Sequence, residues 1–212
     1  MISIHLTLIL FICTLTNAFA LTSDERDRFV STASKEVGTA YYNTETRIDN
    51  YYIADECKYN KWFYDIYYSG LVGTIKTLFK DKDDAAHRAP WCATFVCWCA
   101  SQAGIGDFPF DANVNGIQKW YSDRGRYQLG SWYTPKPGDV VFFSDGSQYY
   151  HIGIVKTVEE TIWAPTLDQT KILITTIEGD IIDGSYSKVA ERDFERDGMS
   201  WGYSEIVGFG EN

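Results

Sequence analysis

Residues 152–158 read IGIVKTV, the longest of four β-branched or aromatic runs in the second half of the chain. The other runs are DVVFF at 139–143, ILITTI at 172–177 and IVGF at 206–209, and turn-forming residues separate them. Such runs are typical of β-strands. Because neighbouring runs are close in sequence, we expect the strands to pair antiparallel, and residues 189–194 are a further candidate strand.

Helical patterns precede these strands. Thr22 and Glu25 form a T-x-x-E capping box, which predicts a helix that runs on to Gly38. A second helix is predicted from Pro90 to Ala103, where a glycine follows. Weaker helical patterns cover 70–79 and 114–121, and the aromatic stretch 51–68 has no clear period. The sequence therefore predicts an α+β fold, with N-terminal helices packed on a C-terminal antiparallel sheet.

The N-terminus has the pattern of a signal peptide. Residues 6–15 read LTLILFICTL, and Ala18-Phe19-Ala20 follows as a small-x-small cleavage site. The apolar run is shorter than the roughly 20 residues that span a bilayer, and no later segment is long and apolar enough. We expect cleavage after Ala20, so that residues 1–20 are the signal and 21–212 form a single catalytic domain. The mature protein is then secreted, either outside the cell or into a vacuolar lumen.

The composition excludes several classes of protein. The chain has 212 residues, of which 45% are hydrophobic, and this proportion indicates a globular fold rather than disorder. Its net charge is −10 without a basic block, which disfavours nucleic acid as a partner. Aromatic residues make up 16% of the chain; core packing explains most of them, and a carbohydrate-lined groove is the alternative. We expect a monomer.

Cys92 is the candidate nucleophile because it lies in the first turn of the helix that Pro90 opens. Unpaired backbone N–H groups and the helix dipole stabilise an anion at such a position. A small buried hydrophobe is the other interpretation of this cysteine. Cys99 shares a face with apolar neighbours and is interpreted as structural. Because Cys97-x-Cys99 is not C-x-x-C, and no pair of histidines accompanies it, we expect neither a metal nor another cofactor.

His151 is the candidate general base, since it begins an apolar strand directly after a turn-rich segment. The other histidine of the mature chain, His87, lies in a charged stretch and is expected to face solvent. Glu178 ends the run at 172–177 and can orient an imidazole. Cysteine, histidine and carboxylate form the nucleophile, base and orienting group of acyl-transfer enzymes.

Five blocks in order resemble the CHAP domains, the cysteine/histidine-dependent amidohydrolases/peptidases. They are PWCATFVCWCASQAGI at 90–105, PKPGDVVFF at 135–143, HIGIV at 151–155, TIEGD at 176–180 and IVGFG at 206–210. The resemblance implies a papain-like α+β fold that hydrolyses amide bonds in bacterial peptidoglycan, in its stem peptides or cross-bridges.

The resemblance also assigns roles. It places the nucleophile at Cys92, the general base at His151 and the orienting carboxylate at Glu178. Asp180 stands where the family has asparagine, as an orienting or oxyanion-supporting residue with a carboxyl group in place of the neutral amide. Some members bind calcium upstream of the nucleophile, but Asp81, Asp83 and Asp84 are poorly spaced for that ion, so no metal is expected here either.

The remaining cysteines suggest one disulfide. Cys92 must stay free, and Cys99 lies seven residues further along the same helix, beyond the reach of a disulfide. Cys97 points to the other side of the helix, and Cys57 lies in the aromatic segment expected to pack beside it. We therefore expect a Cys57–Cys97 disulfide in an oxidising compartment, with four free thiols as the alternative.

Two other functions compete with a CHAP-type peptidoglycan hydrolase. An NlpC-type cell-wall peptidase uses the same chemistry, but its usual D-C-S-G is absent around Cys92, which Trp91 precedes and Ala93 follows. A binding or adhesion domain that keeps the fold without catalysis is the third hypothesis, and the presence of all three candidate catalytic residues argues against it.

Overall fold

The computed structural model describes residues 20–46, 50–53, 56–70, 89–162, 170–202 and 205–212. The described helices are α2 (Ser23–Ser34), α3 (Lys58–Gly70), α5 (Cys92–Gln102) and α6 (Val114–Asp123). Most of the predicted signal peptide, the weak helical pattern at 70–79 beyond its first residue, the aspartates at 81–84 and His87 lie outside the described residues. Within the described ranges, no helix combines the length and hydropathy needed to cross a bilayer.

The described strands form one sheet of nine strands. They are listed here in chain order: β1 (Ala40–Thr46), β2 (Asn50–Ile53), β3 (Tyr127–Leu129), β4 (Val140–Ser144), β5 (Tyr149–Ile162), β6 (Thr170–Asp183), β7 (Tyr186–Asp197), β8 (Ser200–Trp201) and β9 (Ile206–Gly210). The order across the sheet is β2-β1-β7-β6-β5-β4-β9-β3, and β8 pairs with β7. Each of these pairs is antiparallel.

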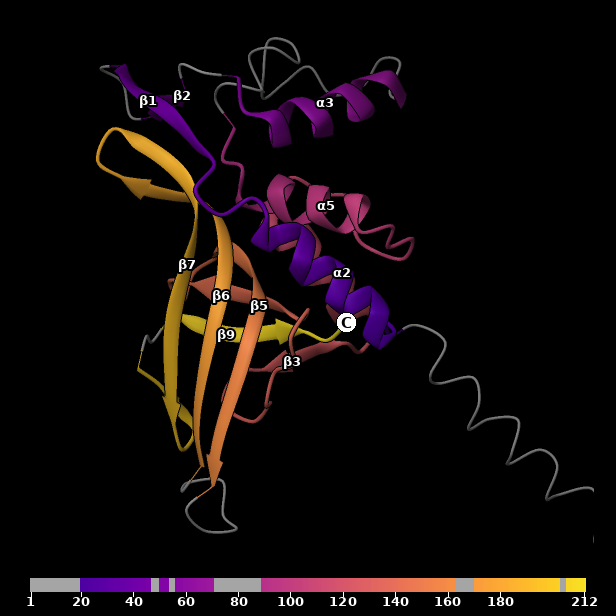
Figure 1. Cartoon of the computed structure of the whole chain (residues 1–212), viewed down its shortest axis with the longest axis vertical. Coiled ribbons are helices and arrows are strands. Elements are labelled where there is room, and N and C mark those ends of the chain that lie inside the picture. The colour runs from indigo at the N-terminus through magenta and orange to yellow at the C-terminus, as the bar shows by residue number, and fades with distance from the viewer. Residues whose placement is uncertain (1–19, 47–49, 54–55, 71–88, 163–169, 203–204) are drawn as a thin grey trace, which may run out of the picture.

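The predicted α+β class is confirmed, with helices α2, α3, α5 and α6 before the main strands (Figure 1). The sheet is larger than predicted, because the hairpin of β1 and β2 adds an N-terminal edge to it beside β7. The aromatic stretch without a clear period contains β2 and most of α3. The first helix has the predicted capping box at Thr22 and Glu25, but it ends at Ser34, before Gly38.

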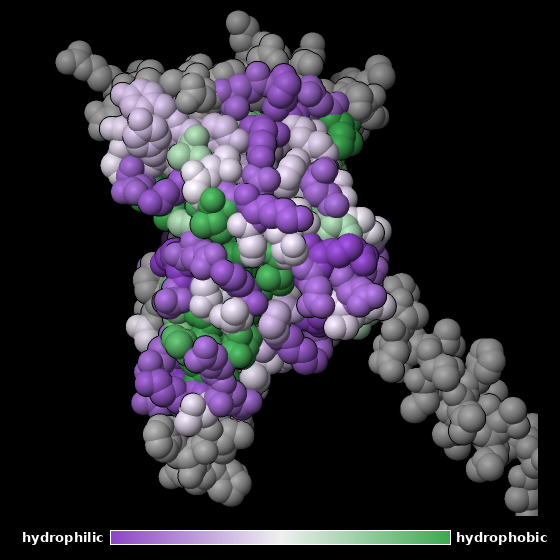
Figure 2. Space-filling model, in the orientation of Figure 1, coloured by the Kyte–Doolittle hydropathy of each residue, from purple (hydrophilic) through white to green (hydrophobic). Residues whose placement is uncertain are grey.

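The central strands bury both of their faces. Along β4, Val140 and Phe142 belong to the core between the sheet and the helices, whereas Val141 and Phe143 belong to a second core on the other face. Burial on both sides explains why DVVFF is continuously apolar rather than alternating. Polar residues cover most of the face shown in Figure 2, with hydrophobic residues in small separate areas.

Asp139 of the P-x-P-G-D block ties three parts of the fold together. Its buried carboxylate accepts hydrogen bonds from Arg26 Nη1 at 2.8 Å, from the Tyr133 hydroxyl at 2.8 Å and from the backbone N–H groups of Lys136 and Asn212 at 2.8 and 3.1 Å. These bonds link α2, the proline turn and the last described residue. Asp139 therefore has a structural role and lies away from the candidate active site.

Candidate active site

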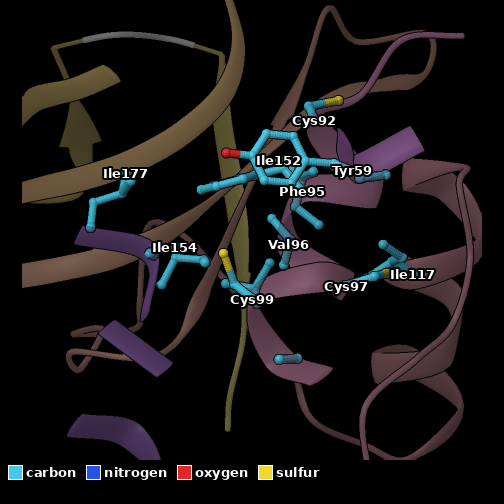
Figure 3. Packing of buried hydrophobic residues seen from close by; sticks show 14 of the residues in the cluster. Tyr59, Cys92, Phe95, Val96, Cys97, Cys99, Ile117, Ile152, Ile154 and Ile177 are labelled. Carbon is cyan, nitrogen blue, oxygen red and sulfur yellow. The ribbon is translucent and has the colours of Figure 1, made fainter. Parts of the chain in front are cut away.

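Cys92 is the first residue of α5, as predicted, and Trp91 is its N-cap residue. Figure 3 shows Cys92 at the end of the helix, ahead of Phe95 and Cys99. The N–H groups of the first helical turn have no partner inside a helix, so this end of α5 suits an anion. No side chain caps the helix at Trp91.

The turn that carries Cys92 is held from two sides. On one side Asn60 of α3 donates to the carbonyl oxygen of Ala89 at 2.7 Å and accepts from the Thr94 hydroxyl at 2.7 Å. Asn60 and Thr94 are both fully buried. On the other side the backbone N–H of Trp91 donates to Asp180 Oδ2 at 3.1 Å. These bonds fix the backbone on either side of the cysteine.

The structure brings Cys92, His151 and Glu178 together. His151 Nε2 lies 2.8 Å from Glu178 Oε2, and the Cys92 side chain is close enough to His151 to raise the pKa of the imidazole. Because Nε2 is occupied by Glu178, Nδ1 is the ring nitrogen available to Cys92. His151 is on β5 and Glu178 is on β6, where Glu178 is the direct cross-strand partner of Gly153. The order is that of a nucleophile, a base and an orienting carboxylate.

Two glycines make room for this arrangement. A Cβ at Gly153 would lie 2.5 Å from Glu178 Cγ, so the carboxylate side chain crosses the space that any other residue would fill. A Cβ at Gly179 would lie 2.7 Å from the Trp91 ring and 2.8 Å from Phe95. The glycines of H-I-G and E-G thus allow β5, β6 and α5 to approach closely enough to join the three side chains.

Two side chains that the sequence analysis did not single out donate hydrogen bonds to Glu178. Thr176 Oγ1 donates to Glu178 Oε1 at 2.5 Å, and Arg192 Nη1 donates to Oε2 at 3.1 Å. Glu178 has no solvent exposure. Thr176 lies two residues before the glutamate and was inside the quoted T-I-E-G-D block. Arg192 lies on β7, and no local pattern distinguishes it from the other charged residues of that strand.

The surroundings of His151 favour its protonated form. Burial by itself lowers the pKa of His151, but hydrogen bonds to Cys92 and Glu178 and the charges of both groups outweigh it and raise that pKa to about 10. An imidazolium is therefore stable here near neutral pH, provided that the groups on both sides of it carry negative charge.

Asp180 orients the nucleophile turn rather than the imidazole. Its carboxylate accepts the Trp91 N–H and, at 2.5 Å, the hydroxyl of Ser187, and burial raises its pKa. Its φ of 65° is left-handed, a conformation that asparagine and aspartate tolerate better than most residues. Both accepted bonds need only oxygen lone pairs, so aspartate can fill the position in which the family has asparagine.

A groove of about 610 Å³ opens beside Cys92. Six of its fifteen lining residues are aromatic, and these come from α3, from the loop before α6 and from the start of β5: Phe63, Tyr64, Tyr67, Phe110, Tyr149 and Tyr150. Phe110 and Tyr150 are 45% and 41% exposed. Part of the aromatic content therefore lines a groove at the nucleophile.

The predicted Cys57–Cys97 disulfide is wrong in this structure, where both cysteines are free and buried. Cys97 Sγ contacts the carbonyl oxygens of Pro109 and Asp111 at 3.2 and 3.4 Å, and it lies beside Ile117 of α6 (Figure 3). Cys57 instead interacts with Tyr41 of β1. Burial raises the pKa of each thiol to about 12, which makes both unreactive.

No metal cluster accompanies the site in the described ranges, which contain no group of three or more His, Cys, Asp or Glu side chains placed to hold an ion.

Comparison with known proteins identifies one family. The model of the CHAP domain matches residues 84–169, which include Cys92 and His151 but end before Glu178. No curated protein and no solved structure matches the chain significantly. The chain therefore carries a CHAP domain match at residues 84–169, in agreement with the family that its motifs predicted.

Proposed function

We propose that this protein is a secreted cysteine amidase or endopeptidase that hydrolyses amide bonds in peptidoglycan stem peptides or cross-bridges. The observation that carries the proposal is the placement of His151 between Cys92 and the buried Glu178, to which it is hydrogen-bonded. The CHAP match supports a hydrolase of the amidase/peptidase type, and peptidoglycan is the substrate that the family implies. The signal peptide predicted at residues 1–20 supports secretion.

The reaction we infer has two halves. The Cys92 thiolate attacks the carbonyl carbon of the amide, and the N–H groups at the start of α5 stabilise the oxyanion. The His151 imidazolium donates its proton to the leaving amine as the C–N bond breaks, which leaves a thioester on Cys92. His151 then takes a proton from water, whose oxygen attacks the thioester. The acid product leaves, and the thiolate–imidazolium pair is restored.

The groove supports a substrate that presents flat or apolar surfaces. Aromatic rings such as Phe110 and Tyr150 can pack against methyl groups of alanine residues or the C–H faces of sugars. Because the chain carries a net charge of −10, long-range attraction to an anionic cell wall cannot supply the affinity. Affinity is then expected to come from contacts in the groove.

Digestion of purified sacculi, followed by mass spectrometry of the released muropeptides, tests the proposal. The wild-type protein should release fragments with a new amine and a new carboxylate, and Cys92→Ala and His151→Ala should release none above background. Cys99→Ala is the matched control on the same helix, since Cys99 is buried away from the groove. Binding to sacculi without release by the wild type would favour the adhesion hypothesis instead.

A further inference from the structure

Arg192 and His151 share one oxygen of a fully buried carboxylate. Arg192 Nη1 is 3.1 Å from Glu178 Oε2, and His151 Nε2 is 2.8 Å from the same atom. Arg192 reaches it from β7, the strand next to β6, where it is the direct cross-strand partner of Thr176 (Figure 1). Its guanidinium also lies over the rings of Phe194 and Phe143, at 4.8 and 5.7 Å from their centroids.

The charges of Cys92, His151 and Glu178 balance only if Arg192 is counted with them. The proposed resting state holds two anions, the Cys92 thiolate and the Glu178 carboxylate, and one cation, the His151 imidazolium. A buried excess of negative charge is costly and is relieved by uptake of a proton. With the Arg192 guanidinium included, the four groups carry no net charge.

We propose that Arg192 is a positioning residue of the active site, which keeps Glu178 ionised so that Glu178 can hold His151 as an imidazolium. The expected effect on turnover rests on the proposed function. The expected effect on the pKa of His151 does not, because it is measured in the substrate-free protein. Without Arg192, Glu178 is the buried anion that loses a cationic partner, so it takes up the proton. A neutral carboxyl then stabilises the imidazolium less well.

The other charged groups around this pair are few among the described residues. Cys92 faces His151 from α5, and Asp180 of β6 interacts with His151 through its charge. Glu191, the neighbour of Arg192 on β7, is paired with Lys156 of β5 at 2.7 Å. Lys156→Met serves as the matched control, because it removes a cation that pairs with β7 at Glu191 and makes no ion pair with Glu178.

The test is an NMR titration of the imidazole C–H protons in the substrate-free protein. The full sequence has only three histidines, His5, His87 and His151, and His87→Gln assigns the signals of the mature chain. Arg192→Met should lower the pKa of His151, in the same direction as Glu178→Gln does. Arg192→Lys should restore most of the shift because it keeps the positive charge, and Lys156→Met should leave the titration unchanged.

Turnover gives the second measurement. Arg192→Met should reduce kcat/KM by about ten- to a hundredfold, as expected for one charge-assisted hydrogen bond. In the Glu178→Gln background the same change should add less than about a twofold loss, because Arg192 acts through Glu178. Additive losses, or an unchanged or raised pKa of His151 in Arg192→Met, would overturn the proposal. Since the titration needs no substrate, its outcome stands whether or not peptidoglycan is the substrate. If Arg192→Met does not fold, Arg192→Gln removes the same charge and carries the same comparison.

Discussion

Replacing Gly153 with alanine should disable the site through one methyl group. The added Cβ would lie 2.5 Å from Glu178 Cγ and 3.3 Å from both the Ile177 carbonyl oxygen and Val141 Cγ1. Ordinary contacts between carbon atoms are about 3.5–4.0 Å. The Glu178 side chain must therefore withdraw by about 1 Å or more, because the other two neighbours leave the methyl group little room to move away.

That displacement breaks the bond that orients the base. The His151 Nε2 to Glu178 Oε2 distance of 2.8 Å would grow beyond hydrogen-bonding range. A misplacement of about 1 Å in a catalytic arrangement costs roughly a hundredfold in rate. Overpacking of a filled core costs about 1–3 kcal/mol of unfolding free energy.

Steady-state kinetics on soluble muropeptides and urea denaturation measure the two effects separately. Gly106→Ala is the matched control, because a Cβ there meets nothing within 4 Å and its φ is not positive. It should change neither activity nor stability. Wild-type turnover by Gly153→Ala would refute the reasoning that this glycine exists to admit the Glu178 side chain.

Three further predictions concern the rest of the chain. Asp139→Asn should lower the unfolding free energy by about 3–5 kcal/mol, measured by urea denaturation, because it removes the charge of a buried ion pair, while the rate per folded molecule stays near wild type. The folded-state pKa of His151 is raised to about 10 from 6.5, so the stabilisation that His151 contributes is complete below about pH 6.5 and is lost as the pH rises through 10. The unfolding free energy should therefore fall more between pH 6 and pH 10 for wild type than for Glu178→Gln. Thiol titration of the denatured mature protein should find four reactive thiols, and a count of two would restore a disulfide such as Cys57–Cys97.

Part of the candidate site could be predicted because the sequence contains few residues of the types that the chemistry needs. Residues 21–212 contain two histidines, and only His151 lies near the start of an apolar run, so it could be chosen as the candidate base without a structure. Cys92 could be chosen because Pro90 marks the start of a helix. Glu178 followed from its place at the end of a strand and from the resemblance. The structure places all three side chains together.

The residues that support the site could not be predicted, because each acts over a long separation in sequence. Asn60 holds the turn before Cys92 from α3 and lies 34 residues before its partner Thr94, and Arg192 reaches Glu178 from the neighbouring strand, 14 residues further along the chain. Neither position has a local pattern that sets it apart. The disulfide prediction failed for the same reason, since the direction in which Cys57 points depends on how the β1 edge joins the sheet.

Strand β1 was missed for a physical reason as well. Residues 40–46 read AYYNTET, in which Asn43 and Glu45 interrupt the tyrosines and threonines, so that no continuous apolar run marks a strand. The strand forms because its first residues pair with the start of β7, at Ala40 with Lys188 and Tyr41 with Ser187. Tertiary pairing thus outweighs a weak local preference.

Trapping of an acyl-enzyme tests the central claim most directly. A soluble cross-linked muropeptide is mixed with excess protein, quenched in acid within the first turnover and analysed by peptide mapping with mass spectrometry. We predict a thioester adduct on the peptide that contains Cys92, which is absent from Cys92→Ala and decays as the acid product appears. Hydrolysis that proceeds at the wild-type rate in Cys92→Ala, or without any adduct on Cys92, would contradict the account.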